Sequence, residues 1–77
     1  MSAPIKKFSA GGIVVSVWEN STEKNGIEKS FNTVTIDRRY KNSEKEWKSS
    51  NSFRANDIPK AILALQEAFR FLSLKEQ

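Results

Sequence analysis

One stretch of the sequence brings together cations and aromatic rings. Within "TVTIDRRYKNSEKEWKSSNSFR", residues 33–54, six basic and three aromatic side chains alternate: Arg38, Arg39, Lys41, Lys45, Lys48 and Arg54 with Tyr40, Trp47 and Phe53. Basic side chains neutralise phosphates and an exposed ring stacks on an unpaired base, so the combination is typical of a surface for single-stranded nucleic acid. The alternative is a solvated sheet surface whose charges serve solubility and discourage edge pairing.

The residue types present argue against catalysis. The chain has no cysteine and no histidine, so it lacks thiolate ligands, the commonest metal ligand and the commonest general base near neutral pH. Asp37, Glu44, Glu46 and Asp57 are scattered, whereas a metal-dependent nuclease needs clustered carboxylates. We therefore expect no enzyme activity, no metal, no cofactor and no small-molecule substrate.

Length and charge limit the remaining choices. The 77 residues make one domain at most, residues 1–77, and so small a core makes a second subunit plausible. The net charge of +4 comes from residues 1–54, which hold ten Lys or Arg and six Asp or Glu. The longest apolar run of the front half, "GIVVSVW", is too short to cross a bilayer, and no signal peptide is visible. We expect an intracellular protein without membrane association, in the cytoplasm or nucleoid of a prokaryote or virus-infected cell, or in a eukaryotic nucleus.

The C-terminal segment predicts an amphipathic helix of about 17 residues. Asp57 or Asn56 can cap it, and Pro59 is tolerated in its first turn. Its sheet-facing residues follow helical spacing: Ile58, Ala61, Ile62, Leu65, Ala68, Phe69 and Leu72. Leu63, Phe71 and Leu74 lie outside or at the edge of that series, so the helix is apolar over more of its circumference than one sheet needs. These three residues predict a homodimer interface between two copies of the helix.

Four strands are expected before the helix, near residues 4–9, 12–20, 31–41 and 46–54. The predicted fold is therefore α+β, a four-stranded antiparallel sheet followed by one helix (ββββα). Asn25-Gly26 favours a type I′ hairpin turn, which would pair Val17 with Val34 and Val15 with Ile36. The polar residues around 20–30 are expected to form a flexible insertion in this hairpin.

The register of the third and fourth strands decides which cations share a face. Placing Phe53 opposite Val34 pairs Tyr40 with Trp47 on the covered face, and it sets Arg39 opposite Lys48 on the open face. This like-charge pair would be mildly destabilising alone and suits a polyanion. Trp18 falls on the open face too, either to stack on bases or with a structural role at a sheet edge or interface.

Arg38 and Lys7 each have an alternative to contact with nucleic acid. Arg38 shares its side with Ile36, so it could instead form an ion pair with Asp37, Glu19 or an acid of the helix. Lys7, with Lys6, could extend the basic track or belong to a frayed terminus.

The order of elements and several short motifs resemble a known family. "VSV" in the second strand, "VTIDRRY" in the third, a polar hairpin and "NDIP" before the helix resemble the single-stranded-DNA-binding domain of the transcriptional coactivator positive cofactor four, with the plant Whirly proteins as more distant relatives. The resemblance covers about residues 6–74. It implies a homodimer whose helices pack together and whose curved sheets present basic and aromatic side chains to unpaired strands. By match, Arg38 or Arg39 would take the basic position after "VTID", and Lys48 and Arg54 those of the return strand. The long insertion "ENSTEKNGIEKS" departs from the family pattern.

The sequence thus predicts a sequence-tolerant binder of single-stranded DNA or RNA, acting in transcription, replication or repair. The residues expected to contact nucleic acid are Lys7, Trp18, Arg38, Arg39, Lys41, Lys48 and Arg54. The competing hypothesis is a small protein-interaction or assembly module that uses the apolar helix face, with a basic sheet that is only solubilising.

Overall fold

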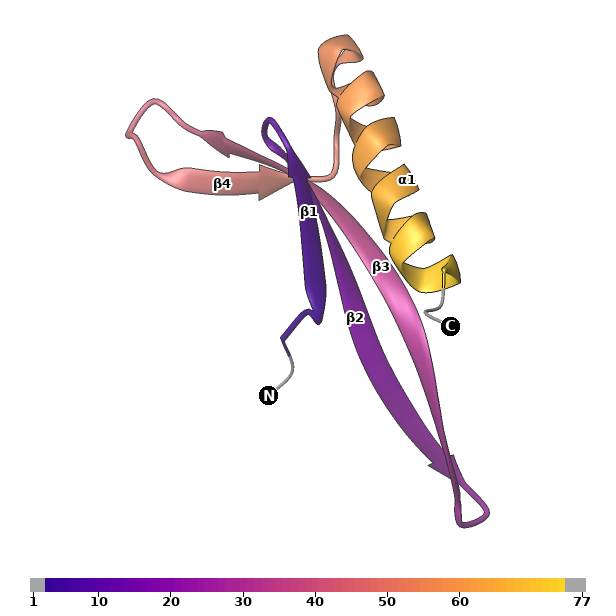
Figure 1. Ribbon diagram of the computed structural model, residues 1–77. Coiled ribbons are helices and arrows are strands. Elements are labelled where there is room, and N and C mark those ends of the chain that lie inside the picture. Colours follow the sequence, from indigo (N-terminus) through magenta and orange to yellow (C-terminus); the bar gives the residue numbers. More distant parts are fainter. Residues whose placement is uncertain (1–2, 75–77) are drawn as a thin grey trace.

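The computed structural model describes residues 3–74 and has the predicted ββββα architecture (Figure 1). The strands pair antiparallel in chain order, and a 3-10 turn leads into the helix. The elements are β1 (Lys6–Ala10), β2 (Ile13–Lys24), β3 (Ile27–Lys41), β4 (Trp47–Ser50), η1 (Ala55–Asp57) and α1 (Ile58–Ser73). Within residues 3–74, no helix is long and apolar enough to cross a membrane.

The core lies between β2 and α1. Ile13, Val15 and Val17 point to one side of β2 and are fully buried, as strand alternation requires. The helix meets them with alanines, namely Ala61, Ala64 and Ala68. Since alanine has only a methyl group, the helix can lie close to β1 and β2, the two strands it contacts most.

The helix therefore buries a narrower face than the sequence predicted. Ala61 and Ala68 do face the sheet, and Leu72 packs against the edge of the core. However, the larger residues of the predicted face are 40–69% exposed: Ile58, Ile62, Leu65 and Phe69. The expectation that these four side chains cover the sheet is wrong, because the buried face is centred on the alanines, about a quarter of a turn away from them.

The hairpin of β2 and β3 has the predicted register. Val17 lies opposite Val34, Val15 lies opposite Ile36, and Asn25 and Gly26 adopt the positive φ values of 54° and 78° that a type I′ turn needs. The ladder continues without interruption to this turn, so residues 20–30 form paired strands where an insertion loop was expected. We call residues 19–32 the arm; it extends beyond the helix at the lower end of Figure 1 and contributes to a length of 50 Å.

The register of β3 and β4 differs from the prediction by one residue. Arg39 lies opposite Ser49, and Lys48 lies opposite Tyr40, so the predicted pair of Arg39 and Lys48 does not form. A shift by one residue moves every side chain of β4 to the other face of the sheet.

The connecting loop causes this shift. The Asn42 side-chain oxygen accepts hydrogen bonds from the backbone N–H groups of Glu44 and Glu46, each at 2.9 Å. Lys45 adopts a positive φ of 63° within this loop. Because Lys41 pairs with Trp47, the loop is one residue longer than the predicted register requires. In addition β4 ends at Ser50, so Phe53 has no partner in the ladder where Val34 was expected.

Candidate nucleic-acid interface

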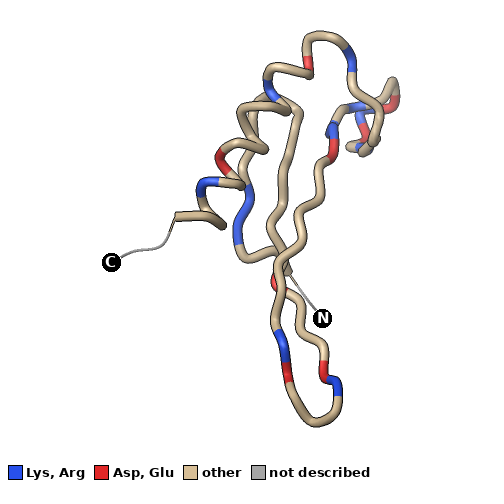
Figure 2. Tube along the Cα trace, turned by 90° about the vertical axis from the view of Figure 1, so that its right-hand side faces the viewer, with Lys and Arg blue, Asp and Glu red and all other residues tan. Residues whose placement is uncertain are grey.

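The two faces of the sheet differ in charge. We call the side that α1 covers the helix face and the other side the open face; alternation along each strand assigns every paired residue to one of them. The open face carries five basic residues and one acidic residue: Lys7, Lys24, Lys29, Arg39, Lys41 and Asp37. The helix face carries three of each: Lys6, Arg38, Lys48, Glu19, Glu23 and Glu28. The positive excess of the strands thus lies entirely on the open face; Figure 2 marks the charged positions along the chain.

Trp18 lies on the open face of a central strand. Its indole N–H donates a 2.9 Å hydrogen bond to the Thr35 hydroxyl on β3, which holds the ring across the sheet. Trp18 pairs with Thr33 of β3 and lies one residue beyond the end of the β1–β2 pairing at Lys6 and Val17, so its strand has a neighbour on one side at this point. The ring remains partly accessible, as stacking on a base requires.

Trp47 is a second aromatic residue of the open face, where the sequence did not predict it. The shifted register places it beside Lys41 and 62% exposed, whereas the prediction paired it with Tyr40 on the covered face. The Lys41 ammonium lies 5.3 Å from the centre of its ring, within cation–π range. The Asn42 loop is the sequence signal that could have revealed it, because an Asn side chain often bonds the backbone two residues on.

A concave site of about 290 Å³ lies next to Trp47 on the same face. It is lined by Gly11, Gly12, Val14, Arg39 and Trp47. A cation and an exposed ring therefore border one cavity, whose floor is apolar side chain and glycine backbone.

Gly12 allows the turn between β1 and β2 to lie close to the backbone of β3. A Cβ at this position would lie 2.6 Å from the Arg39 carbonyl oxygen, closer than non-bonded atoms approach. The Arg39 backbone N–H also donates a 2.7 Å hydrogen bond to the Gly12 carbonyl. The turn between β1 and β2 thus holds the backbone of Arg39, from which this cation projects.

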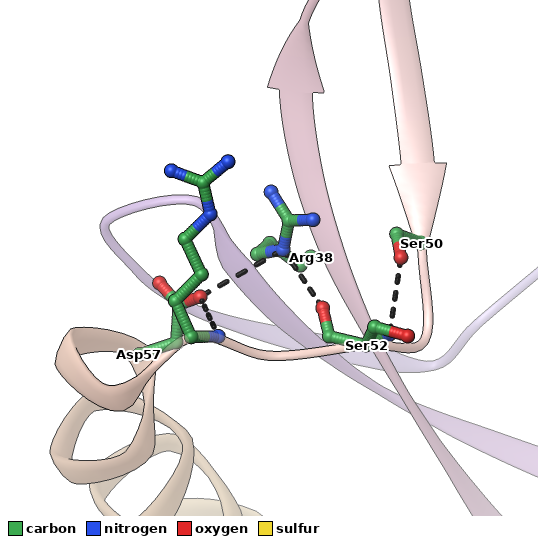
Figure 3. A network of polar contacts seen from close by, with 5 residues as sticks. Arg38, Ser50, Ser52 and Asp57 are labelled. Carbon is green, nitrogen blue, oxygen red and sulfur yellow. Dashed lines mark hydrogen bonds and ion pairs between the residues drawn. The ribbon is translucent and has the colours of Figure 1, made fainter.

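Arg38 lies on the helix face and makes contacts within the subunit. Its Nε donates a 2.8 Å hydrogen bond to the Ser52 carbonyl and lies 3.7 Å from Asp57 Oδ2 (Figure 3). The guanidinium also stacks 4.8 Å from the centre of the Tyr40 ring. This agrees with the ion-pair alternative, with the acid supplied by Asp57 at the start of the helix.

Lys48 lies on the other face of the sheet, and Arg54 lies outside the paired strands. Lys48 is on the helix face opposite Tyr40, as a consequence of the register. Arg54 precedes η1, where its backbone N–H donates a 2.8 Å hydrogen bond to Asp57. The structure thus brings four of the seven predicted contact residues together, and these are Lys7, Trp18, Arg39 and Lys41.

The predicted dimer residues lie on one flank of the helix. Phe71 makes an edge-to-face contact with Phe8 of β1, with ring centres 6.2 Å apart, so part of its surface is used within the subunit. Leu63 and Leu74 are exposed. The opposite flank carries a longer apolar series, Ile58, Ile62, Leu65 and Phe69, which we call the apolar stripe.

Comparisons with protein-family models, curated proteins and solved structures found no match to this chain. The resemblance to the positive-cofactor-four domain therefore stays a prediction.

Proposed function

We propose that the protein binds single-stranded DNA or RNA, with little sequence preference, through the open face of its sheet. The observation that carries the proposal is the sorting of charge between the two faces. Charges that serve only solubility have no reason to separate in this way, whereas a polyanion needs one face with a clear excess of positive charge.

The side chains of the open face suit both parts of a nucleotide. Lys7, Arg39 and Lys41 can neutralise phosphates, while Trp18 and Trp47 offer rings to bases. The concave site of about 290 Å³ is at or below the range of about 300–1,000 Å³ usual for small-molecule pockets, so it suits a single base. Stacking tolerates any base, because every base has a π-face. A duplex hides these faces, so single strands should bind more tightly.

We further propose that the protein is a homodimer in which the apolar stripe of α1 packs on a second copy of itself. The stripe repeats with spacings of four, three and four residues, which is the seam that two helices form when they pack along their length. It contains no charged residue, and the neighbouring Val34 on the helix face of β3 is 39% exposed. The interface proposed on the described surface thus differs from the one predicted at Leu63, Phe71 and Leu74.

The apolar stripe also supports the second candidate function, a module that assembles with a different protein. In that case the stripe would be occupied by the partner, and the protein alone would be a monomer that binds single strands no better than duplexes.

Fluorescence anisotropy with labelled single-stranded and duplex oligonucleotides, at two salt concentrations, tests nucleic-acid binding. Arg39→Gln removes a cation from the open face, and Lys48→Gln makes the same charge change on the helix face as a matched control. We expect Arg39→Gln to weaken single-strand binding and to lower the log–log salt slope by about 0.7, the value for one phosphate contact. Lys48→Gln should leave both nearly unchanged. Equal effects of the two substitutions, or equal affinity for single strands and duplex, would contradict binding through the open face.

A further inference from the structure

We propose that the arm is a second part of the nucleic-acid interface, and that a single strand on the main sheet continues along the open face of the arm to Lys24, Lys29 and Phe31. The inference rests on the proposed function and extends it to residues that were expected to form a flexible insertion.

The arm sorts its charges by face even more completely than the sheet as a whole. Both of its lysines, Lys24 and Lys29, lie on the open face. All three of its glutamates lie on the helix face, and two of them, Glu23 and Glu28, are direct cross-strand partners. Like charges directly opposite each other destabilise a hairpin, so folding alone does not favour this arrangement. A polyanion is repelled by one side of the arm and attracted by the other.

The open face of the arm also carries its apolar surface. Phe31 is 49% exposed and lies opposite Asn20, next to the pair of Trp18 and Thr33. The ring of Phe31 therefore follows that of Trp18 along the same face, and Lys29 follows Phe31. Basic and aromatic side chains in succession are the pattern found along single-strand binding grooves.

A shallow concave site of about 250 Å³ lies at the outer end of this track. It is lined by Thr22, Lys24, Asn25, Ile27 and Lys29. Apart from the turn residue Asn25, these residues belong to the open face, so the cavity opens on the side that carries the lysines. Its position between two cations suits a phosphate or sugar of the bound strand.

The arm holds its shape without help from the helix. Residues 21–33 are all exposed, yet the ladder runs to the turn. Asn20 donates a side-chain hydrogen bond of 2.9 Å to Thr33, and Asn32 donates one of 3.3 Å to the Trp18 carbonyl. A two-stranded ribbon is otherwise marginally stable in water, so these bonds and the type I′ turn help to keep the two strands of the arm paired.

Two double substitutions on the arm of the full-length protein test the proposal. Lys24→Gln with Lys29→Gln removes two charges from the open face; Glu23→Gln with Glu28→Gln removes two from the opposite face of the same segment. Binding of a long labelled oligothymidylate is measured over a range of salt concentrations, and circular dichroism checks that each variant is folded. We expect the lysine variant to lower the log–log salt slope by about 1.4, two contacts at about 0.7 each. The glutamate variant should leave the slope unchanged.

Phe31→Ala provides an independent measurement, because it changes no charge. Loss of a stacked base should raise the dissociation constant for the long oligonucleotide at least about fivefold. Little effect is expected with an oligonucleotide too short to extend beyond the main sheet.

Three outcomes would overturn the proposal. If the glutamate variant strengthens binding as much as the lysine variant weakens it, the arm acts only through net charge. If all arm variants bind normally while Arg39→Gln weakens binding, the strand does not reach the arm, and the proposed function still stands. If the unmodified protein does not prefer single strands, the proposed function fails as well.

Discussion

Trp47 is the residue whose removal should most reduce contact with bases. It is the most exposed tryptophan of the open face and borders the cavity beside Arg39. We expect Trp47→Ala to weaken single-strand binding by about 1–3 kcal/mol, the value of one stacked base, without changing the salt slope, because no charge is lost. The thermal midpoint should change little, since the ring buries little of its surface within the subunit.

Tyr40→Ala is the contrasting aromatic substitution. Tyr40 lies on the helix face under Arg38, so its loss should lower stability more than affinity. If Trp47→Ala binds single strands like the unmodified protein, base stacking must be assigned to Trp18 alone or abandoned.

For individual residues, the sequence predicted the face of the sheet correctly where the alternation of side chains along a strand decides it. Trp18, Arg39 and Lys41 lie on the expected face because β2 and β3 have the expected register. Lys7 lies on the same face through the pairing of β1 with β2. Lys48 and Trp47 each lie on the face opposite to the predicted one. The loop before them contains Lys45 in a left-handed conformation, which a lysine in a sequence does not predict. The structural role of Arg38 does not follow from the sequence, because its partners Ser52 and Asp57 lie 14 and 19 residues further along the chain.

Among the elements, the tight turn between β1 and β2 is the most sensitive to substitution. Gly12→Ala would place a Cβ against the Arg39 carbonyl of β3, where backbone cannot give way easily. We expect a loss of about 1–3 kcal/mol in the free energy of unfolding, as for other overpacked sites, measured by urea denaturation. Because Gly12 lines the cavity, single-strand binding should weaken as well.

Gly26→Asn serves as the control for this substitution. Gly26 has a positive φ of 78° with open space around it, and asparagine accepts such a conformation better than other non-glycine residues. The free energy of unfolding of Gly26→Asn should therefore change by much less than that of Gly12→Ala. If Gly12→Ala were as stable as the unmodified protein, the close approach of the turn to β3 would not be a constraint on the fold.

The helix shows which properties of an element the sequence predicts and which it does not. Apolar periodicity and the proline of the first turn predict that this segment is a helix, where it begins and about how long it is. The orientation of the helix does not follow from these signals, because periodicity counts Ala61 and Ile62 alike as apolar. Ile13, Val15 and Val17 already fill the space above the sheet, and only methyl groups fit against them. The choice between two neighbouring apolar faces is thus made by the volume of side chains on another element.

For the whole molecule, the apolar stripe is the main surface without an explanation inside the subunit. Residues 3–74 form one elongated unit of 50 × 29 × 17 Å. The basic open face lies on one side of the sheet and α1 lies on the other. Dimerisation through α1 would cover the stripe and leave both open faces free for nucleic acid. Since binding of a second subunit stabilises only the folded state, the thermal midpoint of such a dimer should rise with protein concentration.

Phe69→Glu tests this arrangement directly. Phe69 is the most exposed residue of the apolar stripe, at 69%, so a buried, unpaired carboxylate at this site should dissociate a dimer while leaving the subunit folded. Leu63→Glu is the matched control, because Leu63 lies on the other flank of α1 and is 54% exposed. Phe71→Glu is less suitable, since it would also disrupt the contact with Phe8.

We expect sedimentation velocity at micromolar concentration to show a dimer for the unmodified protein and for Leu63→Glu, and a monomer for Phe69→Glu. Dissociation by Leu63→Glu instead would restore the interface that the sequence predicted at Leu63, Phe71 and Leu74. A monomer in every case would leave the stripe to a different protein and favour the assembly module, because an apolar surface of this size on a small domain needs an occupant.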